Sequence, residues 1–213
     1  MRKAFEIGGL VAAVALVAFG VAAIVIGMNG RDTVQSSLKQ EYIVGTPDMN
    51  KTAIAAEAQK AGLPASLKLP TANIAGKEIT NGNLARDFAK YMRIHTLEAT
   101  GGQTYAQLPR YATADGKGTN DPTKALTSKG QPVDNPVRNI WVTETALTTA
   151  LNTSYMAEQL ANFGIVVGVA LVLTGLGFGV LSIGGALRSE EGAFGFHKKP
   201  VDATPQVPVV PVA

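Results

Sequence analysis

The sequence NFGIVVGVALVLTGLGFGVLSIGGAL, residues 162–187, decides the fold that we predict for this chain. It contains no charged residue, and as a helix it is long enough to cross a hydrocarbon core about 30 Å thick. At 3.6 residues per turn its small residues share one face, while branched apolar residues cover most of the remainder. Lipid gives no hydrophobic drive between helices, so close backbone contact favours their association. We therefore expect another helix to pack against Gly164, Gly168, Gly175, Gly179, Ser182 and Ala186.

A second apolar segment, residues 7–28, lies near the N-terminus. It also contains no charged residue and is also long enough to cross a membrane as a helix. A cleaved signal peptide usually has a shorter apolar region, of about 7 to 15 residues, so the sequence favours a retained anchor. Its small residues again share a face: Gly9, Ala13, Gly20, Ala23 and Gly27. We expect the two faces to pack together in one hairpin. Oligomers built on these faces remain an alternative, and Gly and Ala are also common in membrane helices generally.

Basic residues beside the apolar segments predict the orientation of the chain in a membrane. They are Arg2, Lys3, Arg188, Lys198 and Lys199. Because Lys and Arg mark the cytoplasmic side, we expect both termini in the cytoplasm. The predicted segments are a cytoplasmic start (1–6), a first span (7–28), an extracytoplasmic cap (29–162), a second span (163–187) and a Pro-rich cytoplasmic tail (188–213). The predicted fold class is an all-α membrane protein, a two-helix transmembrane hairpin with a loop-rich, mainly helical cap.

The composition excludes several classes of function. The chain has no cysteine, so it offers no disulfide, thiol nucleophile, thiolate zinc site or cysteine-ligated iron–sulfur cluster. Its net charge of +3 is small and dispersed, which argues against a nucleic-acid partner. Neither apolar segment contains an ionisable residue, and such residues usually mark ion and proton pathways. Among channel hypotheses, the sequence still allows a self-assembled pore that is lined by the glycine faces.

Three helices are predicted between or leading into the spans. Thr46 as N-cap and Pro47 open a short helix that ends at Ala61. Asn83 caps an amphipathic helix that ends before Gly101 and Gly102. From Pro136 a third helix runs without Gly or Pro toward the second span. We expect a small cap core in which Trp141 packs with Tyr42, Phe88, Tyr91 and Tyr105.

The amphipathic helix carries the one polar cluster that we single out, His95, Glu98 and Tyr91. His95 lies on the apolar face, where a histidine is more often a hydrogen-bonded core residue than a ligand. Its spacing from Glu98 suits two ligands of one metal ion, but the predicted cap has no second histidine to complete a usual site. We therefore predict no catalytic residue, no cofactor and no metal. The basic face of the same helix, with Arg86, Lys90 and Arg93, is expected to be solvated.

Residues 91–105, 139–147 and 152–157 resemble a family of small two-span bacterial membrane proteins with no established activity. Some members carry an automatic label as aromatic ring-opening dioxygenases. Extradiol enzymes of that type hold iron with two histidines and a carboxylate in one pocket. Here His95 and His197 are the only histidines, and the predicted topology puts them on opposite sides of the membrane. We reject the dioxygenase label for this chain.

These patterns favour a non-enzymatic protein of the bacterial cell membrane, an accessory subunit, assembly factor or envelope scaffold. Its expected partners are membrane lipid and either another membrane protein or a second copy of the chain. An envelope enzyme or ligand-binding protein that uses the cluster around His95 is the second hypothesis. A channel component or a receptor is the third.

Overall fold

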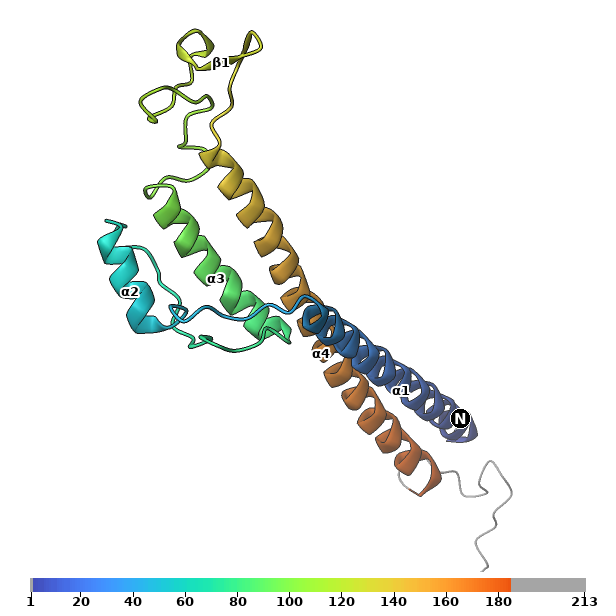
Figure 1. Cartoon of the computed structure of the whole chain (residues 1–213). Coiled ribbons are helices and arrows are strands. Elements are labelled where there is room, and N and C mark those ends of the chain that lie inside the picture. The colour runs from blue at the N-terminus through green and yellow to red at the C-terminus, as the bar shows by residue number, and fades with distance from the viewer. Residues whose placement is uncertain (1, 185–213) are drawn as a thin grey trace, which may run out of the picture. The chain divides into compact units, whose positions relative to one another are not determined.

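The computed structural model describes residues 2–184, and they are mainly helical, as predicted (Figure 1). The helices are α1 (Arg2–Gln40), α2 (Lys51–Lys60), α3 (Gly82–Ala99) and α4 (Val137–Ile183). Between α3 and α4 lie a short 3-10 helix, η1 (Pro122–Lys124), and two antiparallel strands, β1 (Thr127–Ser128) and β2 (Gln131–Pro132). The expectations for Ala186 and for the tail, residues 188–213, lie outside the described residues.

Two helices, α1 and α4, are long and apolar enough to cross a membrane. The chain divides into two compact units, and each of these helices contributes to both. One unit, here called the apolar unit, joins α1 up to Ile24 to α4 from Val166 onward. The other, the cap unit, comprises Val25–Ile165.

Glycines bring the two backbones of the apolar unit into direct contact. A Cβ atom placed on Gly168 would lie 2.6 Å from the carbonyl oxygen of Gly20, and one on Gly20 would lie 2.7 Å from that of Gly168. A Cβ on Gly175 would lie 2.9 Å from the carbonyl oxygen of Ala13. Later residues of α4 meet earlier residues of α1, so the two segments run antiparallel. Side chains larger than hydrogen do not fit at these three glycines.

The other residues predicted to pack the helices differ in burial. Gly9, Ala13 and Ser182 are buried in the apolar unit, and Gly27 is buried in the cap unit. Half-buried positions are Ala23, Gly164 and Gly179. The buried positions Ala13, Gly20 and Gly27 on α1 and Gly168, Gly175 and Ser182 on α4 recur at every seventh residue, the spacing typical of left-handed helix packing. The face of small residues predicted from the sequence is therefore wider than the set of residues that lie in closest contact.

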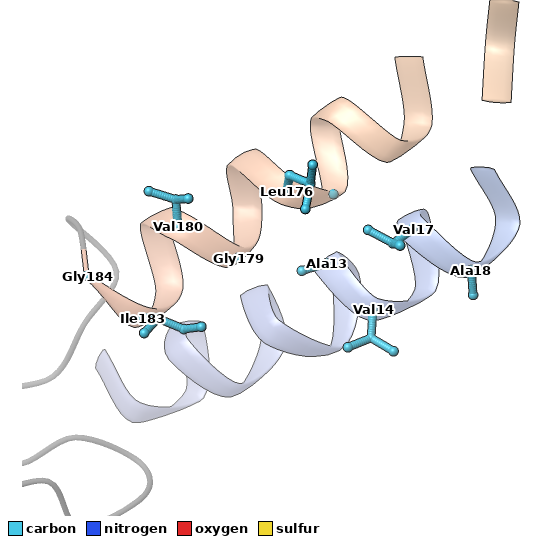
Figure 2. Close-up of a pocket in the computed structure, with 10 residues that line it drawn as sticks. Ala13, Val14, Val17, Ala18, Leu176, Gly179, Val180, Ile183 and Gly184 are labelled. Carbon is cyan, nitrogen blue, oxygen red and sulfur yellow. The ribbon is translucent and has the colours of Figure 1, made fainter. Parts of the chain in front are cut away.

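An apolar groove of about 740 Å³ runs along the apolar unit (Figure 2). Side chains of both helices line it, among them Ala13 and Val14 of α1 and Leu176, Val180 and Ile183 of α4. Every lining residue is aliphatic or glycine. The groove therefore suits hydrocarbon and has no polar group to orient a ligand.

The core of the cap unit is built where α2 and α3 pack together and meet residues of α1 and α4 (Figure 1). Its buried residues include Leu38 of α1, Ile54 of α2, Tyr91 of α3 and Leu151 of α4. A smaller cluster joins Leu97, Leu108 and Trp141. Trp141 and Phe88 are buried as predicted, although in separate clusters.

Two predicted members of the aromatic core are not buried. Tyr42 is 88% exposed and has a positive φ of 51° just after α1 ends, so it belongs to a chain reversal. Tyr105 is 46% exposed, and the guanidinium of Arg138 stacks 4.0 Å from its ring centre.

The basic face of α3 also differs from the prediction in part. Arg86 and Arg93 are exposed but lie over the rings of Tyr155 and Trp141 on α4.

The predicted N-caps were wrong by a few residues. Helix α2 begins after Asn50, whose side-chain oxygen accepts hydrogen bonds from the amides of Thr52 and Ala53. Thr46, the predicted cap, instead hydrogen-bonds Asp48 through its hydroxyl. Helix α3 is capped by Asn81 rather than Asn83, so an Asn-Gly pair that resembles a turn signal begins a helix here.

Glu158 of α4 holds three parts of the cap unit together. Its carboxylate accepts hydrogen bonds from the Gln35 side chain of α1, at 2.9 Å, and from the backbone amide of Gly82 at the start of α3. Arg31 lies 3.6 Å from the same carboxylate. The Glu158 side chain is only 6% exposed, so these donors replace water around a buried charge.

We expect Gly168→Ala to lower the free energy of unfolding by about 1–3 kcal/mol, because the new methyl group overpacks the contact with Gly20. Gly177→Ala is the matched control, since a Cβ at Gly177 of the same helix meets no atom within 4 Å. The measurement is an SDS titration from mild detergent, followed by far-UV circular dichroism. Equal stability of the two variants would contradict the close helix contact.

Glu158→Ala is expected to destabilise the cap unit by about 1–3 kcal/mol, because it leaves the buried Gly82 amide without a partner. Glu158→Gln keeps an acceptor oxygen and should lose less. The fluorescence of Trp141, the single tryptophan, reports unfolding of the cap unit. A loss as large in the glutamine variant as in the alanine variant would argue against the hydrogen-bond role.

Candidate functional site

Asp48, Glu57 and His95 come together on the cap unit from three separate parts of the chain. Asp48 belongs to the turn before α2, Glu57 lies on α2 and His95 lies on α3. One oxygen of Asp48 is 3.6 Å from Nε2 of the imidazole, and one oxygen of Glu57 is 3.6 Å from Nδ1. One potential ligand atom of each residue lies within 4.8 Å of the others. We call this group the His95 cluster.

Local hydrogen bonds place Asp48. The hydroxyl of Thr46 donates to Oδ1 of Asp48, while the other oxygen, Oδ2, faces His95. The turn is closed by a hydrogen bond from the Met49 amide to the Thr46 carbonyl, and Ile74 then donates its amide to the Met49 carbonyl. Because Ile74 and Met49 are buried, the turn is fixed to the core of the cap unit.

Packing of α2 beside α3 places the other two residues. Helix α2 buries Ile54 and Ala58, and Glu57 lies beside this buried face. His95 lies next to buried Ile94 on α3 and is itself half-buried. Oε2 of Glu57 and Nε2 of His95 are shielded from solvent and have no hydrogen-bond partner. Buried polar atoms are usually satisfied, so this pair needs an explanation.

Burial and the neighbouring charges both act on the carboxyl group of Glu57. Burial is the main cause that raises the pKa of Glu57 above its ordinary value, and the negative charge of Asp48 adds to the effect. The charge of Glu98 acts in the same direction, whereas His95 and Lys60 oppose it. Burial and these two negative charges together favour the protonated, neutral form of Glu57.

The residues that sequence analysis grouped with His95 have different roles. Tyr91 is fully buried, and its hydroxyl donates a hydrogen bond of 2.5 Å to the carbonyl oxygen of Ala72. Burial raises the pKa of this phenol, so Tyr91 is a neutral core residue. Glu98 is exposed and influences Glu57 through its charge. Among residues 2–184, the ionic contacts found for His95 are with Asp48 and Glu57.

Sequence reasoning missed Asp48 and Glu57. Neither residue is at a motif spacing from His95. The sequence predicts that both belong to a short helix, but it does not predict where that helix packs in the cap. The available signal was the unusual placement of His95 on the apolar face of α3, because a buried histidine needs partners. It did not show which segment would supply them.

One imidazole and two carboxylates can act in two ways. They are suitable ligands for a divalent metal ion, because imidazole and carboxylate are both common donors. Without a cation, the same groups can hold a protonated imidazole between two carboxylates as an ion pair.

No protein-family model, no curated protein and no solved structure was found to match this chain. The resemblance to the two-span bacterial family therefore stays a prediction. Rejection of the dioxygenase label also stays a prediction, since His197 lies outside the described residues.

We expect Glu57→Gln to stabilise the cap unit at pH 7 in chelator-treated protein. A carboxyl group with a raised pKa stabilises the fold while it is protonated, and that contribution falls as the pH rises above the ordinary value of 4.5. Glutamine keeps the neutral form, so its advantage should vanish below that pH. Unfolding followed by Trp141 fluorescence at both pH values measures the difference. A glutamine variant less stable than the parent at pH 7 would show that the charge of Glu57 is favourable.

Proposed function

We propose that this chain is a two-pass protein of the bacterial cell membrane that acts without chemistry of its own. In this proposal α1 and α4 form a transmembrane hairpin, both termini are cytoplasmic, and the cap unit is extracytoplasmic. The protein works as an accessory subunit, assembly factor or envelope scaffold through contacts made by its cap and its helices.

The observation that carries the proposal is that many large apolar side chains of the apolar unit are exposed, whereas in a water-soluble protein such side chains are mostly buried. Glycines lie at the closest contacts between α1 and α4, and many large apolar residues point outward. Exposed fractions are 70% for Phe19, 64% for Leu173 and 69% for Val180. A water-soluble protein rarely exposes a continuous apolar surface of this kind, whereas a lipid bilayer solvates it.

The groove of the apolar unit supports a role for lipid as the first partner. It is entirely aliphatic and opens beside Gly175, Gly179 and Gly184, where α4 presents little side-chain volume. A bilayer would place acyl chains against it. The small-residue face also suits a helix of another membrane protein or of a second copy, because such faces allow close backbone approach.

One observation favours the second candidate function, a cap that binds a small ligand. The His95 cluster brings three ionisable side chains together in a half-buried position. The channel hypothesis gains no such support. Within the described residues, no ionisable side chain lies between Ile7 and Met28 or between Phe163 and Gly184.

Introduced cysteines test the proposed orientation, because the chain has none of its own. Ser66→Cys lies on an exposed part of the cap unit, and Ser189→Cys lies in the tail. In intact cells a membrane-impermeant maleimide should label position 66, while position 189 should react only after permeabilisation. The reverse pattern would invert the topology, and equal labelling in intact cells would contradict the two-span arrangement.

Extraction of the chain from its native membrane in mild detergent tests the proposed role. Native mass spectrometry should find it bound to another membrane protein or to further copies of itself. A chain that is always monomeric and solitary would overturn the accessory or scaffold role. The cysteine experiment would still stand, so location and role can fail separately.

A further inference from the structure

We propose that Asp48, Glu57 and His95 form a binding site for one divalent transition-metal ion, with Zn²⁺ as the representative case. One imidazole nitrogen and one oxygen of each carboxylate would be its ligands. This inference goes beyond the scaffold role and does not depend on it.

The spacing of the donor atoms fits a shared ion. For metal–ligand bonds of about 2.0–2.2 Å, ligand atoms around one ion are about 3.0–4.2 Å apart, depending on the geometry. Nε2 of His95 lies 3.6 Å from Oδ2 of Asp48, and Nδ1 lies 3.6 Å from Oε2 of Glu57. One ligand atom of each residue lies within 4.8 Å of the other two. Because an ion binds a single ring nitrogen, a side-chain rotation would have to bring both carboxylates to that nitrogen.

The state of the donor atoms points to a missing partner. Nε2 of His95 and Oε2 of Glu57 are both shielded from water, and neither makes a hydrogen bond. At 3.6 Å the contacts of the imidazole with Asp48 and Glu57 are longer than good hydrogen bonds. A cation bound to Nε2 would satisfy that nitrogen, and rotation of the Glu57 carboxylate toward the ion would give Oε2 a partner as well.

The surroundings orient the ligands in the manner expected for a metal site. The hydroxyl of Thr46 engages one oxygen of Asp48 and leaves the other directed at His95. Hydrogen bonds of this kind to a ligating carboxylate fix its direction and are typical around bound metals.

The donor set indicates the class of ion. A nitrogen ligand favours zinc and similar transition ions over Mg²⁺ and Ca²⁺, which prefer oxygen ligands alone. Three protein ligands leave at least one coordination position for water. The side chains are 33% exposed for Asp48, 28% for Glu57 and 24% for His95, so an ion can reach them from solvent.

The competing interpretation is a structural ion pair in which a protonated His95 bridges the two carboxylates. Under both interpretations Asp48 and His95 stabilise the cap unit, so loss of stability in a variant of either residue does not separate them. Direct observation of the imidazole nitrogens does, because a metal ion binds the lone pair of one nitrogen, whereas both nitrogens carry a proton in the ion pair.

The experiment uses the full chain in detergent, treated with chelator, with ¹⁵N-labelled histidine and His197→Gln as the background, so that His95 is the single imidazole. Titration with ZnCl₂ is followed by calorimetry and by the imidazole ¹⁵N signals. Asp48→Asn, Glu57→Gln and His95→Gln are compared with Glu78→Gln, a matched control at an exposed position of the cap unit. Circular dichroism establishes that each variant is folded.

We expect one Zn²⁺ per chain and a change of the ¹⁵N signal of one imidazole nitrogen at saturation. Each of the three site variants should raise the Kd for Zn²⁺ by at least about tenfold. Glu78→Gln should bind like the parent, and MgCl₂ should leave the imidazole signals unchanged. Imidazole signals that do not respond to Zn²⁺, or a Kd that is the same in the folded site variants and the control, would overturn the proposal in favour of the ion pair.

Discussion

The contact of two helix backbones at Gly20, Gly168 and Gly175 is the constraint on which the proposed anchor depends. Where carbonyl oxygens lie closer than a Cβ atom allows, only glycine fits, and many of the large apolar side chains lie on the outer faces. In water that arrangement would leave a wide apolar surface unsatisfied, and in lipid it is the stable one. One steric condition therefore connects the residue pattern to the helix contact and to the environment that we propose.

Much of the helical framework could be predicted from the sequence, because length and periodicity are local properties. The apolar segments and the uninterrupted run from Pro136 into α4 carry strong signals, and both appear as long helices. The exact residues that cap a helix or reverse the chain were harder to predict, because several neighbouring residues can fill each role. Asn50 and Asn81, rather than Thr46 and Asn83, cap the helices, since several polar residues in each stretch could do so. The exposure of Tyr42 depends on where the chain reverses.

The His95 cluster shows the limit of such prediction for the site. His95 could be recognised as a misplaced polar residue, but its partners come from a turn and a helix about 40 residues earlier in the chain. They meet it because α2, which buries Ile54 and Ala58, packs on α3, and this is a tertiary contact between segments far apart in the sequence. A contact of that kind leaves no spacing rule in the sequence. The structure thus shows that His95, for which the sequence predicts no partner, lies beside Asp48 and Glu57.

Glu158 also bears on the order in which the protein can be completed during synthesis. It follows Gly82 by 76 positions and Gln35 by 123, yet it supplies the acceptor for both. Helix α3 therefore leaves the ribosome long before its first amide has a partner, and both hydrogen bonds to Glu158 form only once α4 has been translated. Until then the nascent segment between the two long helices has to be kept from aggregation or premature proteolysis. Completion of this unit therefore waits for Glu158 of α4.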